Sequence, residues 1–392
     1  MSTKHACPVC STEGAVFFEL RGAPVFAGVQ YASAQEAIDA PRGDLELAFC
    51  PTCGMIWNVA FDESLMDYSQ EYDNSLHFSK VFQDYTQGIV DHLVATYDLK
   101  GKDVIDLGCG KGDFLAMLAE ATGGRGTGFD PSFEGERVKS PAADRLTYHV
   151  DFYGEKYADH QADLITSRYV LEHIEKPVEF LQMIRRSIGD RDSVVYFEVP
   201  DLTLIIDHLS VWDIIYEHCL YFGVESLART FARGGFEVLD VRQGYGEQFV
   251  SVEARPADGP NDSGDRWGDI PALTGRVAAF RAAFDTSVAQ WTERLDAARD
   301  AGKTVIGWGA GAKAVGFFGM LDIDHTRVPA CVDINPHKHG KFLAGTGQEI
   351  VSPESLVESK PDVVIVMNPV YTEEIRSQLA ELGLQPEILE AS

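Results

Sequence analysis

One stretch of the chain decides its fold. It reads Val104-Ile105-Asp106-Leu107-Gly108-Cys109-Gly110-Lys111-Gly112-Asp113-Phe114, an apolar run that ends in a glycine-rich turn. A segment that favours helix follows directly, from Phe114 to Glu120. Because glycine has no Cβ, such a turn lets the backbone approach a ligand closely. The pattern predicts a strand, a loop and a helix that together bind a small molecule.

A carboxylate further along the chain indicates what the turn binds. Asp130 ends the next apolar segment, Gly126–Phe129, about 20 residues after the turn, which is the usual interval for a carboxylate that binds a ribose. Gly108, Gly110 and Gly112 stand at every second position, whereas a pyrophosphate site has the spacing GxGxxG. The stretch therefore predicts a nucleoside cofactor without a phosphate.

The composition limits the possible classes of protein. A chain of 392 residues, 45% of them hydrophobic, is long enough for two or three domains with sizeable cores. Its 33 Lys and Arg against 61 Asp and Glu give a net charge of -28, which argues against a nucleic-acid partner. No apolar run reaches the roughly 18 residues of a membrane span, and the N-terminus lacks the apolar core of a signal peptide. We therefore expect a cytoplasmic protein without a membrane partner.

Strands and helices alternate from residue 101 to residue 255. This alternation predicts a mostly parallel, doubly wound sheet with a hairpin at its end. The candidate strands are Asp103–Leu107, Arg125–Phe129, Leu146–Val150, Ala162–Ser167, Ser193–Glu198, Phe236–Val241 and Phe249–Ala254.

A second α/β unit is expected in residues 256–392. It opens with a linker at 256–270 and a long helical pattern from about Ala272 to Ala301. The strand that follows ends in another glycine turn, Gly309-Ala310-Gly311. Further candidate elements are the strands Pro329–Asp333 and Asp362–Met367 and the helix Thr372–Leu382.

Four of the seven cysteines form two matched pairs near the N-terminus. The pairs are Cys7 with Cys10 and Cys50 with Cys53, each with the spacing CxxC. Two such pairs supply four thiolates for a tetrahedral zinc ion, and a site closed by four protein ligands serves folding rather than catalysis. We predict a structural zinc domain over residues 1–60.

Residues 61–100 are expected to connect this domain to the first sheet. Aromatic and apolar positions from Phe78 to Leu93 have helical spacing and predict an amphipathic helix laid on that sheet. Packing accounts for most such stripes, and the alternative is a lid over a pocket. Tyr72 is the candidate for a lid tyrosine that faces the pocket, and Tyr68 competes with it.

The glycine-rich stretch Asp106–Phe114 resembles motif I of the class I S-adenosylmethionine-dependent methyltransferases. The resemblance implies a Rossmann-like core whose seven-stranded sheet ends in an antiparallel pair. It also implies that Asp151 and Phe152 lie near the adenine and that the segment from Ser167 to Leu171 borders the methionine moiety. The cofactor-binding residues expected from it are Asp106, Gly108, Gly110, Phe114, Asp130, Asp151, Phe152 and Ser167.

The resemblance extends over nearly the whole chain. Two CxxC pairs, a methyltransferase core and a C-terminal Rossmann-like α/β domain are the plan of bacterial nucleotide-sugar C-methyltransferases. The best-known members methylate carbon 3 of thymidine-diphospho 4-keto-6-deoxy sugars. We therefore expect a nucleotide-sugar substrate, with S-adenosylmethionine and structural zinc as cofactors, and a monomer or a small homo-oligomer.

Carbon methylation requires a base that removes a proton next to a ketone while the enolate oxygen is stabilised. The segment Trp212–Phe222 resembles the family's Tyr-His-Glu-His element, in which the last His is the proposed base. On this resemblance His218 is the base and Glu217 is its acidic neighbour. The family's Tyr falls on Ile215, so Tyr216 is the substitute donor. His173, after the fourth strand, matches a second active-site His.

The C-terminal glycine turn is the expected site of the substrate's nucleotide diphosphate. Helix N-termini after glycine turns favour phosphate, and several lysines lie nearby in an otherwise acidic chain. The alternative for these lysines is a solvated loop. The substrate-binding residues expected from the turn and from the family motifs are Gly309, Lys313, Asn335, Lys338, Lys341 and Asn368.

Other functions remain open at the level of sequence. The altered Tyr216 motif leaves room for O- or N-methylation of a sugar or a related metabolite. The C-terminal turn followed by Asp333 is also compatible with a nicotinamide-dependent sugar oxidoreductase or epimerase. A non-catalytic zinc scaffold is the fourth alternative.

Overall fold

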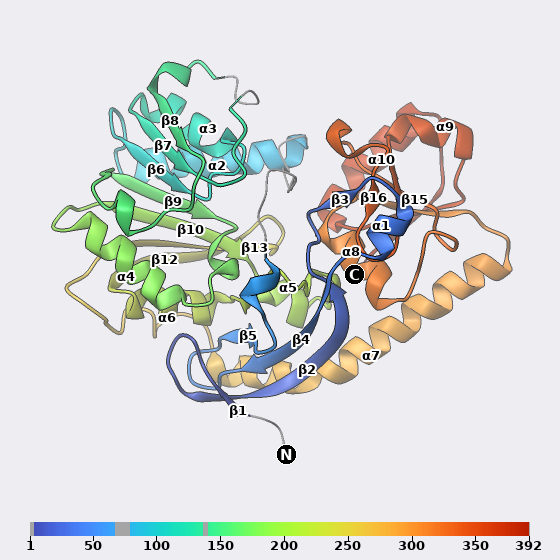
Figure 1. Ribbon diagram of the computed structural model, residues 1–392, viewed down its shortest axis with the longest axis horizontal. Coiled ribbons are helices and arrows are strands. Elements are labelled where there is room, and N and C mark those ends of the chain that lie inside the picture. Colours follow the sequence, from blue (N-terminus) through green and yellow to red (C-terminus); the bar gives the residue numbers. More distant parts are fainter. Residues whose placement is uncertain (1–3, 67–78, 136–139, 392) are drawn as a thin grey trace.

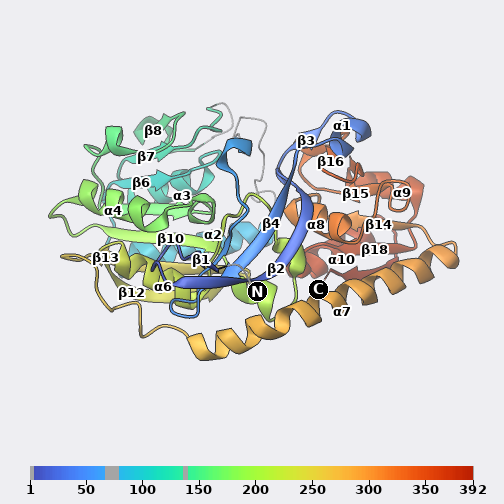
Figure 2. The ribbon, with the colours of Figure 1, turned by 60° about the horizontal axis from the view of Figure 1, so that its bottom comes forward.

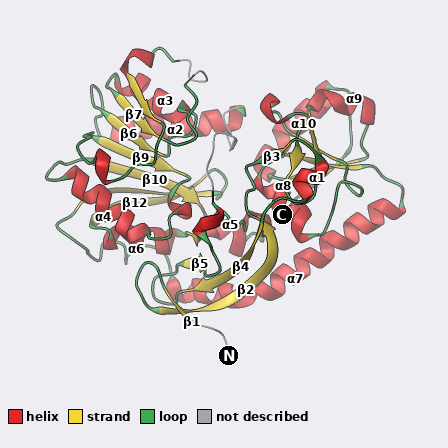
Figure 3. Cartoon of the chain, viewed as in Figure 1, coloured by secondary structure: helices red, strands yellow, loops and turns green. Residues whose placement is uncertain are grey.

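The protein is described by a computed structural model that covers residues 4–66, 79–135 and 140–391. Figure 1 shows two α/β lobes side by side, one built around the first glycine turn and the other around the second. The N-terminal strands lie between and below the two lobes. The helices cover both faces of the sheets in each lobe (Figure 3).

The first lobe contains the predicted seven-stranded sheet. Its strand order is β12-β13-β10-β9-β6-β7-β8, and β13 runs antiparallel to both of its neighbours while the other pairs are parallel. All seven strands expected from the sequence are present. Their bounds are β6 Val104–Leu107, β7 Gly126–Phe129, β8 Leu146–His149, β9 Leu164–Arg168, β10 Val194–Pro200, β12 Phe236–Gly244 and β13 Phe249–Pro256.

Two hydrophobic clusters lie on the two faces of this sheet. Helices α2 (Lys80–Thr96) and α3 (Asp113–Thr122) bury apolar residues on one face, and α4 (Pro177–Ile188) and α6 (Val224–Arg233) do so on the other. Burying both faces explains why these strands are almost entirely apolar, as parallel strands usually are. A helix α5 (Leu202–Ile206) follows β10.

The five-stranded N-terminal sheet is built from two distant parts of the chain. Its order is β1-β2-β4-β5-β11, with β1 Lys4–Ala6, β2 Glu13–Pro24, β4 Arg42–Phe49, β5 Ile56–Asn58 and β11 Leu220–Tyr221. Strand β11 comes from the first lobe, and Leu220 pairs with Trp57. The boundaries 1–60, 61–100, 101–255 and 256–392 remain our proposal, and this sheet crosses them.

The C-terminal lobe is also completed by a strand from the N-terminal segment. Its sheet has the order β19-β18-β14-β15-β17-β16-β3, in which β3 (Gln30–Tyr31) pairs with β16. The helix α1 (Ala34–Ile38) follows β3. The other elements are β14 Val305–Trp308, α8 Ala312–Met320, β15 Ala330–Val332, β16 Phe342–Leu343, β17 Glu349–Val351, α9 Leu356–Ser359, β18 Val363–Val366, α10 Thr372–Glu381 and β19 Glu387–Glu390.

The long helix α7 (Ile270–Asp300) joins the lobes, as the helical pattern of that segment predicted. It runs along one side of the molecule beneath β2 and reaches the C-terminal lobe (Figure 2). Phe280 and Phe284 of α7 pack edge-on against Phe18 of β2, with ring centroids 5.5 and 4.8 Å away. The N-terminal segment is therefore packed against all other parts of the chain. Among the described residues, no helix is long and apolar enough to cross a membrane.

Candidate active site

The first glycine turn has the geometry that its sequence predicts. Gly108, Gly110 and Gly112 have φ values of +71°, +54° and +91°, in the left-handed region that favours glycine. A Cβ at Gly108 would lie 2.1 Å from Val170 Cγ2, whereas in the described part of the chain a Cβ at Gly110 would meet no heavy atom within 4 Å. Gly108 therefore allows close packing inside the protein, and Gly110 faces space that the described residues leave open.

Asp130 closes the turn from the end of β7. Its Oδ2 accepts a hydrogen bond from Gly110 N at 2.8 Å, and its Oδ1 accepts bonds from Ser132 N and Oγ, both at 2.7 Å. Asp106 lies deeper, at the end of β6, and accepts a hydrogen bond from Thr166 Oγ1 at 2.7 Å. Burial raises the pKa of Asp106 to about 7. Asp130 thus borders the open side of the turn while Asp106 supports it from beneath.

The other expected cofactor residues divide into two groups. Phe152 is 62% exposed beyond β8, next to Asp151, whose carboxylate is paired with Lys156 and Tyr157. These hydrogen bonds hold the pKa of Asp151 below its ordinary value. Ser167 and Phe114 instead support the fold. Ser167 donates to the carbonyl of Leu107 at 2.9 Å, and the Phe114 ring lies 4.5 Å from the Arg168 guanidinium within the core.

Two histidines meet beside this turn. His173 ends the 3-10 turn Leu171–His173 after β9, three residues beyond the Val170 that packs on Gly108. Its ring centroid lies 5.1 Å from that of His218, which precedes β11. Nδ1 of His173 is 2.8 Å from the carbonyl oxygen of Glu217. The sequence prediction that His173 and His218 belong to one site is consistent with this geometry.

Burial keeps both histidines neutral. It lowers the pKa of His173 to about 4, and it lowers the pKa of His218 well below the ordinary value, with a further contribution from His173. A carbonyl oxygen can only accept a hydrogen bond, so Nδ1 of His173 carries the proton. Nε2 is therefore the unprotonated nitrogen of the neutral ring, which fixes the tautomer.

The structure adds a residue that the sequence analysis did not select. Glu172 is only 2% exposed, and neither of its carboxyl oxygens has a hydrogen-bond partner among the described residues. Its Oε1 lies 3.9 Å from His173 Nε2, and one ligand atom each from Glu172, His173 and His218 lie within 4.8 Å of one another. Burial raises the pKa of Glu172 to about 8. The Leu-Glu-His segment was visible in the sequence, but nothing there indicated that Glu172 points toward the histidines.

Tyr216 and Glu217 point toward the N-terminal segment. The Tyr216 hydroxyl accepts a hydrogen bond from Asp62 N at 2.9 Å, and its ring stacks on Phe61 with centroids 5.5 Å apart. The Glu217 carboxylate accepts a bond from Ala27 N at 3.2 Å. The expected lid residue Tyr72 and its competitor Tyr68 lie outside the described residues.

The second glycine turn repeats the design of the first. Asp333, at the end of β15, accepts a hydrogen bond from Ala310 N at 3.1 Å, as Asp130 does from Gly110. Lys338 is buried and donates to Asp333 Oδ2 and to the Ala310 carbonyl, each at 3.1 Å. Asn335 is also buried, and its side chain caps the turn that carries Lys338. Gly309, Asn335 and Lys338 are therefore brought together.

The remaining expected substrate residues lie apart from that cluster. Lys313 is ion-paired with Asp213 of the first lobe. Asn368 exchanges two side-chain hydrogen bonds with Gln248 of the first lobe, at 2.6 and 2.8 Å. Lys341 is exposed. Lys313 and Asn368 thus join the two lobes, and Lys341 is the solvent-exposed lysine among them.

The four N-terminal cysteines converge as the CxxC pairs predict. Cys7 Sγ lies 3.5 Å from Cys53 Sγ, Cys10 Sγ lies 3.4 Å from Cys50 Sγ, and all four sulfur atoms lie within 4.8 Å of one another. Thiolates bound to tetrahedral zinc at about 2.3 Å are separated by slightly less than 4 Å. The donor set therefore fits a structural zinc ion.

Comparisons with known proteins agree with this architecture. Residues 79–241 match the family described as "Methyltransferase domain", and residues 274–385 match "C-methyltransferase C-terminal domain". The chain is 27% identical over 324 residues to the C-methyltransferase NovU of Streptomyces niveus, with 76% of each chain covered. The protein is a class I S-adenosylmethionine-dependent methyltransferase.

Solved structures of methyltransferases also resemble part of the chain. One is magnesium protoporphyrin IX methyltransferase (ChlM) from Synechocystis PCC 6803 with bound SAH, with a TM-score of 0.36 and 19% identity over 45% of this chain and 84% of that chain. Another is 1,6-didemethyltoxoflavin-N1-methyltransferase of Burkholderia thailandensis, with a TM-score of 0.33 and 17% identity over 46% of this chain and 82% of that chain.

Proposed function

We propose that the methyltransferase transfers a methyl group to a carbon atom of a nucleotide-linked keto-deoxy sugar. The observation that carries this proposal is the pair of buried, neutral histidines beside the cofactor turn, His173 and His218. A C–H bond next to a ketone is only weakly acidic, so breaking it requires a positioned general base such as a neutral imidazole. The similarity to the C-methyltransferase NovU supports the same reaction class.

In this mechanism His218 is the general base. The bound S-adenosylmethionine supplies an electrophilic methyl group. His218 takes the proton from the carbon next to the ketone. The electron pair of that C–H bond would form the new bond to the methyl carbon, while the methyl C–S bond breaks and its electron pair leaves with S-adenosylhomocysteine. Excluding water keeps the neutral imidazole available, and holding the two carbons in line lowers the entropic barrier.

The enolate oxygen needs a hydrogen-bond donor, and Tyr216 is our candidate. Its hydroxyl oxygen accepts from Asp62 N, which leaves the hydroxyl proton free for another acceptor. Glu217 holds the segment in place through its bond from Ala27 N. Tyr72 stays a candidate from the sequence alone.

We propose that the nucleotide part of the substrate binds at the second glycine turn. Gly309 has a φ of +107° and precedes the N-terminus of α8, which attracts a diphosphate. Lys338 and Asn335 lie under this turn, and Lys341 is exposed nearby in the sequence. Lys313 and Asn368 connect the site to the first lobe, so they couple substrate binding to the catalytic lobe.

The hydrogen bond between Tyr216 and the N-terminal segment favours one alternative reaction, O- or N-methylation. Because its hydroxyl is bonded to the N-terminal segment and Ile215 stands where relatives have Tyr, the oxyanion donor is less well defined than the base. O- or N-methylation of a sugar or a related metabolite needs no such donor. The nicotinamide alternative is less well supported, since the Asp333 carboxylate that would bind a ribose is already paired with Lys338.

Isotope exchange tests the reaction. The enzyme is incubated with S-adenosylmethionine and a thymidine-diphospho 4-keto-6-deoxy sugar in deuterated water. With S-adenosylhomocysteine in place of the methyl donor, C-methylation predicts deuterium uptake at the reacting carbon. A methoxy or N-methyl signal in the NMR spectrum of the methylated product would establish O- or N-methylation. His218→Ala should abolish uptake while calorimetry still detects cofactor binding. His208→Ala, a surface histidine paired with Glu247, is the control. Binding of NAD(H) but not of S-adenosylmethionine would overturn the assignment.

A further inference from the structure

Glu172 has a carboxyl group beside the two histidines and has no role in the mechanism proposed above. Glu172 is buried, and both of its oxygens lack hydrogen-bond donors in the described part of the chain. A buried polar group without a partner is costly, and in a native structure it calls for a functional or structural explanation. Here the side chain lies within 4.8 Å of ring nitrogens of both His173 and His218.

The acidic residue adjacent to the base in sequence does not fill this role. The Glu217 carboxylate accepts a hydrogen bond from Ala27 N in the N-terminal segment, and its backbone carbonyl accepts from His173 Nδ1. Nε2 of His173 lies 3.9 Å from Glu172 Oε1. Among the described residues, Glu172 thus places a carboxyl oxygen within 4.8 Å of a ring nitrogen of each histidine.

We infer that Glu172 is the positioning residue of the base, a carboxylate whose negative charge stabilises the imidazolium that forms when His218 accepts the substrate proton. This inference rests on the proposed function of His218. Glu172 gives up its own proton to solvent before the reaction. The substrate proton then passes to His218, the C–H electron pair forms the new carbon–carbon bond, and the methyl C–S bond breaks with its electron pair leaving on the sulfur of S-adenosylhomocysteine. A paired carboxylate makes a buried imidazole a stronger base because it offsets the desolvation of the cation.

The charged surroundings of Glu172 determine the direction of its pH dependence. His173 and His218 face it and are neutral; Cys219 donates to its backbone carbonyl at 3.4 Å; and the charge of Glu198 on β10, which is paired with Arg168, disfavours its ionisation. Its pKa of about 8 means that the carboxyl group is mostly protonated at neutral pH. The active, ionised form therefore accumulates as the pH rises through this value.

The first experiment measures kcat against pH for the wild type and for Glu172→Gln. In the wild type, kcat should rise through about pH 8 and then level off. In Glu172→Gln the rise should be absent and kcat should be about 100-fold lower, the lower end of what a positioned base contributes. Glu172→Asp, which keeps the carboxyl group, should restore the rise in part. Glu253→Gln, which removes another buried carboxylate on β13, should keep the wild-type profile.

A second measurement separates this inference from the proposed function, because it needs no substrate. The ring signals of His173 and His218 in NMR spectra of the folded protein should change between pH 7 and 9 in the wild type but not in Glu172→Gln. Identical spectra in both proteins would overturn the role of Glu172, whatever the isotope exchange shows. Failure of the wild type to exchange deuterium would instead overturn the reaction while leaving the NMR result standing.

Metal analysis of the purified protein tests the inference in a third way. Two imidazoles and a carboxylate are also a ligand set for a divalent transition metal. The purified protein should contain metal only at the four-cysteine site. A second equivalent that is lost in Glu172→Gln but kept when a cysteine of the cluster is replaced would identify a metal site and would overturn the inference.

Discussion

Two glycines of the cofactor turn are both left-handed, but they face different surroundings. Gly108 lies against Val170 of the segment that carries His173, and Gly110 faces the open side of the turn. The same residue type at neighbouring positions thus serves packing in one case and ligand access in the other. The difference arises because Val170 approaches the turn from another strand.

This contrast leads to a prediction at the scale of single residues. Gly108→Ala should destabilise the protein by roughly 2–5 kcal/mol, since it combines left-handed strain with overlap against Val170. Gly110→Ala should cost only the strain, about 1–2 kcal/mol, but should weaken S-adenosylmethionine binding strongly because the new methyl group enters the cofactor space. Denaturant unfolding and calorimetry measure the two effects. Equal losses of stability in both variants would contradict this assignment of the two glycines.

Residue type and spacing indicated the two histidines and Glu217, but not the position of Glu172 beside them. Sequence adjacency favours Glu217, whose carboxylate instead accepts a hydrogen bond from Ala27, 190 positions earlier in the chain. Glu172 comes into position only because the turn after β9 and the segment before β11 meet at one edge of the sheet. Which side chain faces a given imidazole therefore depends on how these two segments pack against each other.

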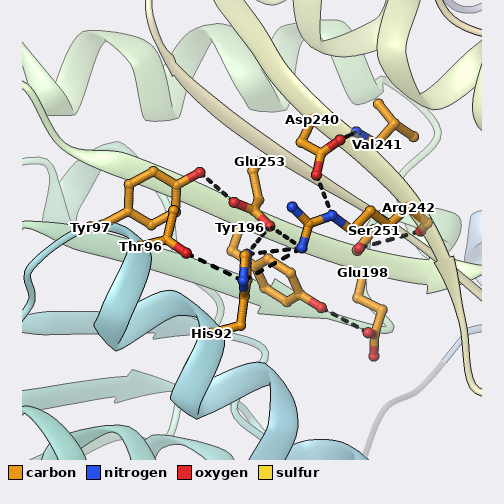
Figure 4. Close-up of polar contacts among 10 residues, drawn as sticks. All are labelled: His92, Thr96, Tyr97, Tyr196, Glu198, Asp240, Val241, Arg242, Ser251 and Glu253. Atoms are coloured by element: carbon orange, nitrogen blue, oxygen red, sulfur yellow. Dashed lines mark hydrogen bonds and ion pairs between the residues drawn. The ribbon is translucent and has the colours of Figure 1, made fainter.

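At the scale of elements, helix α2 is fastened to the sheet by two buried carboxylates. Tyr85 donates to Glu198 of β10 at 2.6 Å. The Glu253 carboxylate on β13 is hydrogen-bonded to His92 Nε2 at 2.8 Å and accepts a hydrogen bond from the Tyr97 hydroxyl. Arg242 forms an ion pair with the same carboxylate (Figure 4). These contacts fix the position of the helix along the strands, which apolar contacts alone would leave less well defined.

The Tyr97 contact can be tested directly. Tyr97→Phe removes a donor to a buried carboxylate and should cost about 1.5–3 kcal/mol in the free energy of unfolding. Gln87→Ala, which removes an exposed hydrogen bond to Asp91 on the same helix, should change stability by less than about 0.5 kcal/mol. Urea unfolding measures both. A Tyr97→Phe variant as stable as the wild type would show that Glu253 is satisfied by His92 and Arg242 alone.

Helical periodicity predicted α2 but not its anchors. The expected segment from Phe78 to Leu93 overlaps the observed helix, Lys80–Thr96. The observed helix continues beyond Leu93, where the predicted segment ended. Apolar spacing reports the face that packs against the sheet. It carries no information about Glu253, which follows the end of the helix by more than 150 residues.

At the scale of the whole molecule, the N-terminal segment connects the parts that must cooperate. Strand β11, directly after His218, pairs with β5, which follows the second cysteine pair. Strand β3 completes the C-terminal sheet, and α7 packs on β2. The cysteine cluster thus lies on the same sheet as the strand that follows His218.

Removing the metal should show this connection. Cys50→Ser should lose one equivalent of zinc, lower the Tm by several degrees and reduce methyl transfer, because β5 no longer holds β11 and His218 in place. S-adenosylmethionine binding should persist, since the glycine turn lies on the other sheet. Cys331→Ala, at a buried cysteine outside the cluster, should keep the zinc. Elemental analysis, thermal unfolding and calorimetry measure these outcomes, and full activity without zinc would refute the connection.

The sequence by itself determined the features that depend on local pattern. The glycine spacing of Gly108 to Gly112 indicated the cofactor, alternating apolar runs predicted all seven strands of the first sheet, and the paired CxxC motifs predicted the cysteine cluster. Each of these signals lies within a few residues of the chain or in a regular repeat. Backbone geometry and the chemistry of the side chains are enough to interpret them.

Only the tertiary structure decided which distant residues meet. It placed Glu172 beside the two histidines, directed Glu217 and Tyr216 toward the N-terminal segment, and paired Lys313 with Asp213 across the lobes. It also joined β11 to β5 and β3 to β16. These contacts depend on how whole sheets and helices pack. A short hydrophobic strand or a single carboxylate does not specify its partner until that packing is complete.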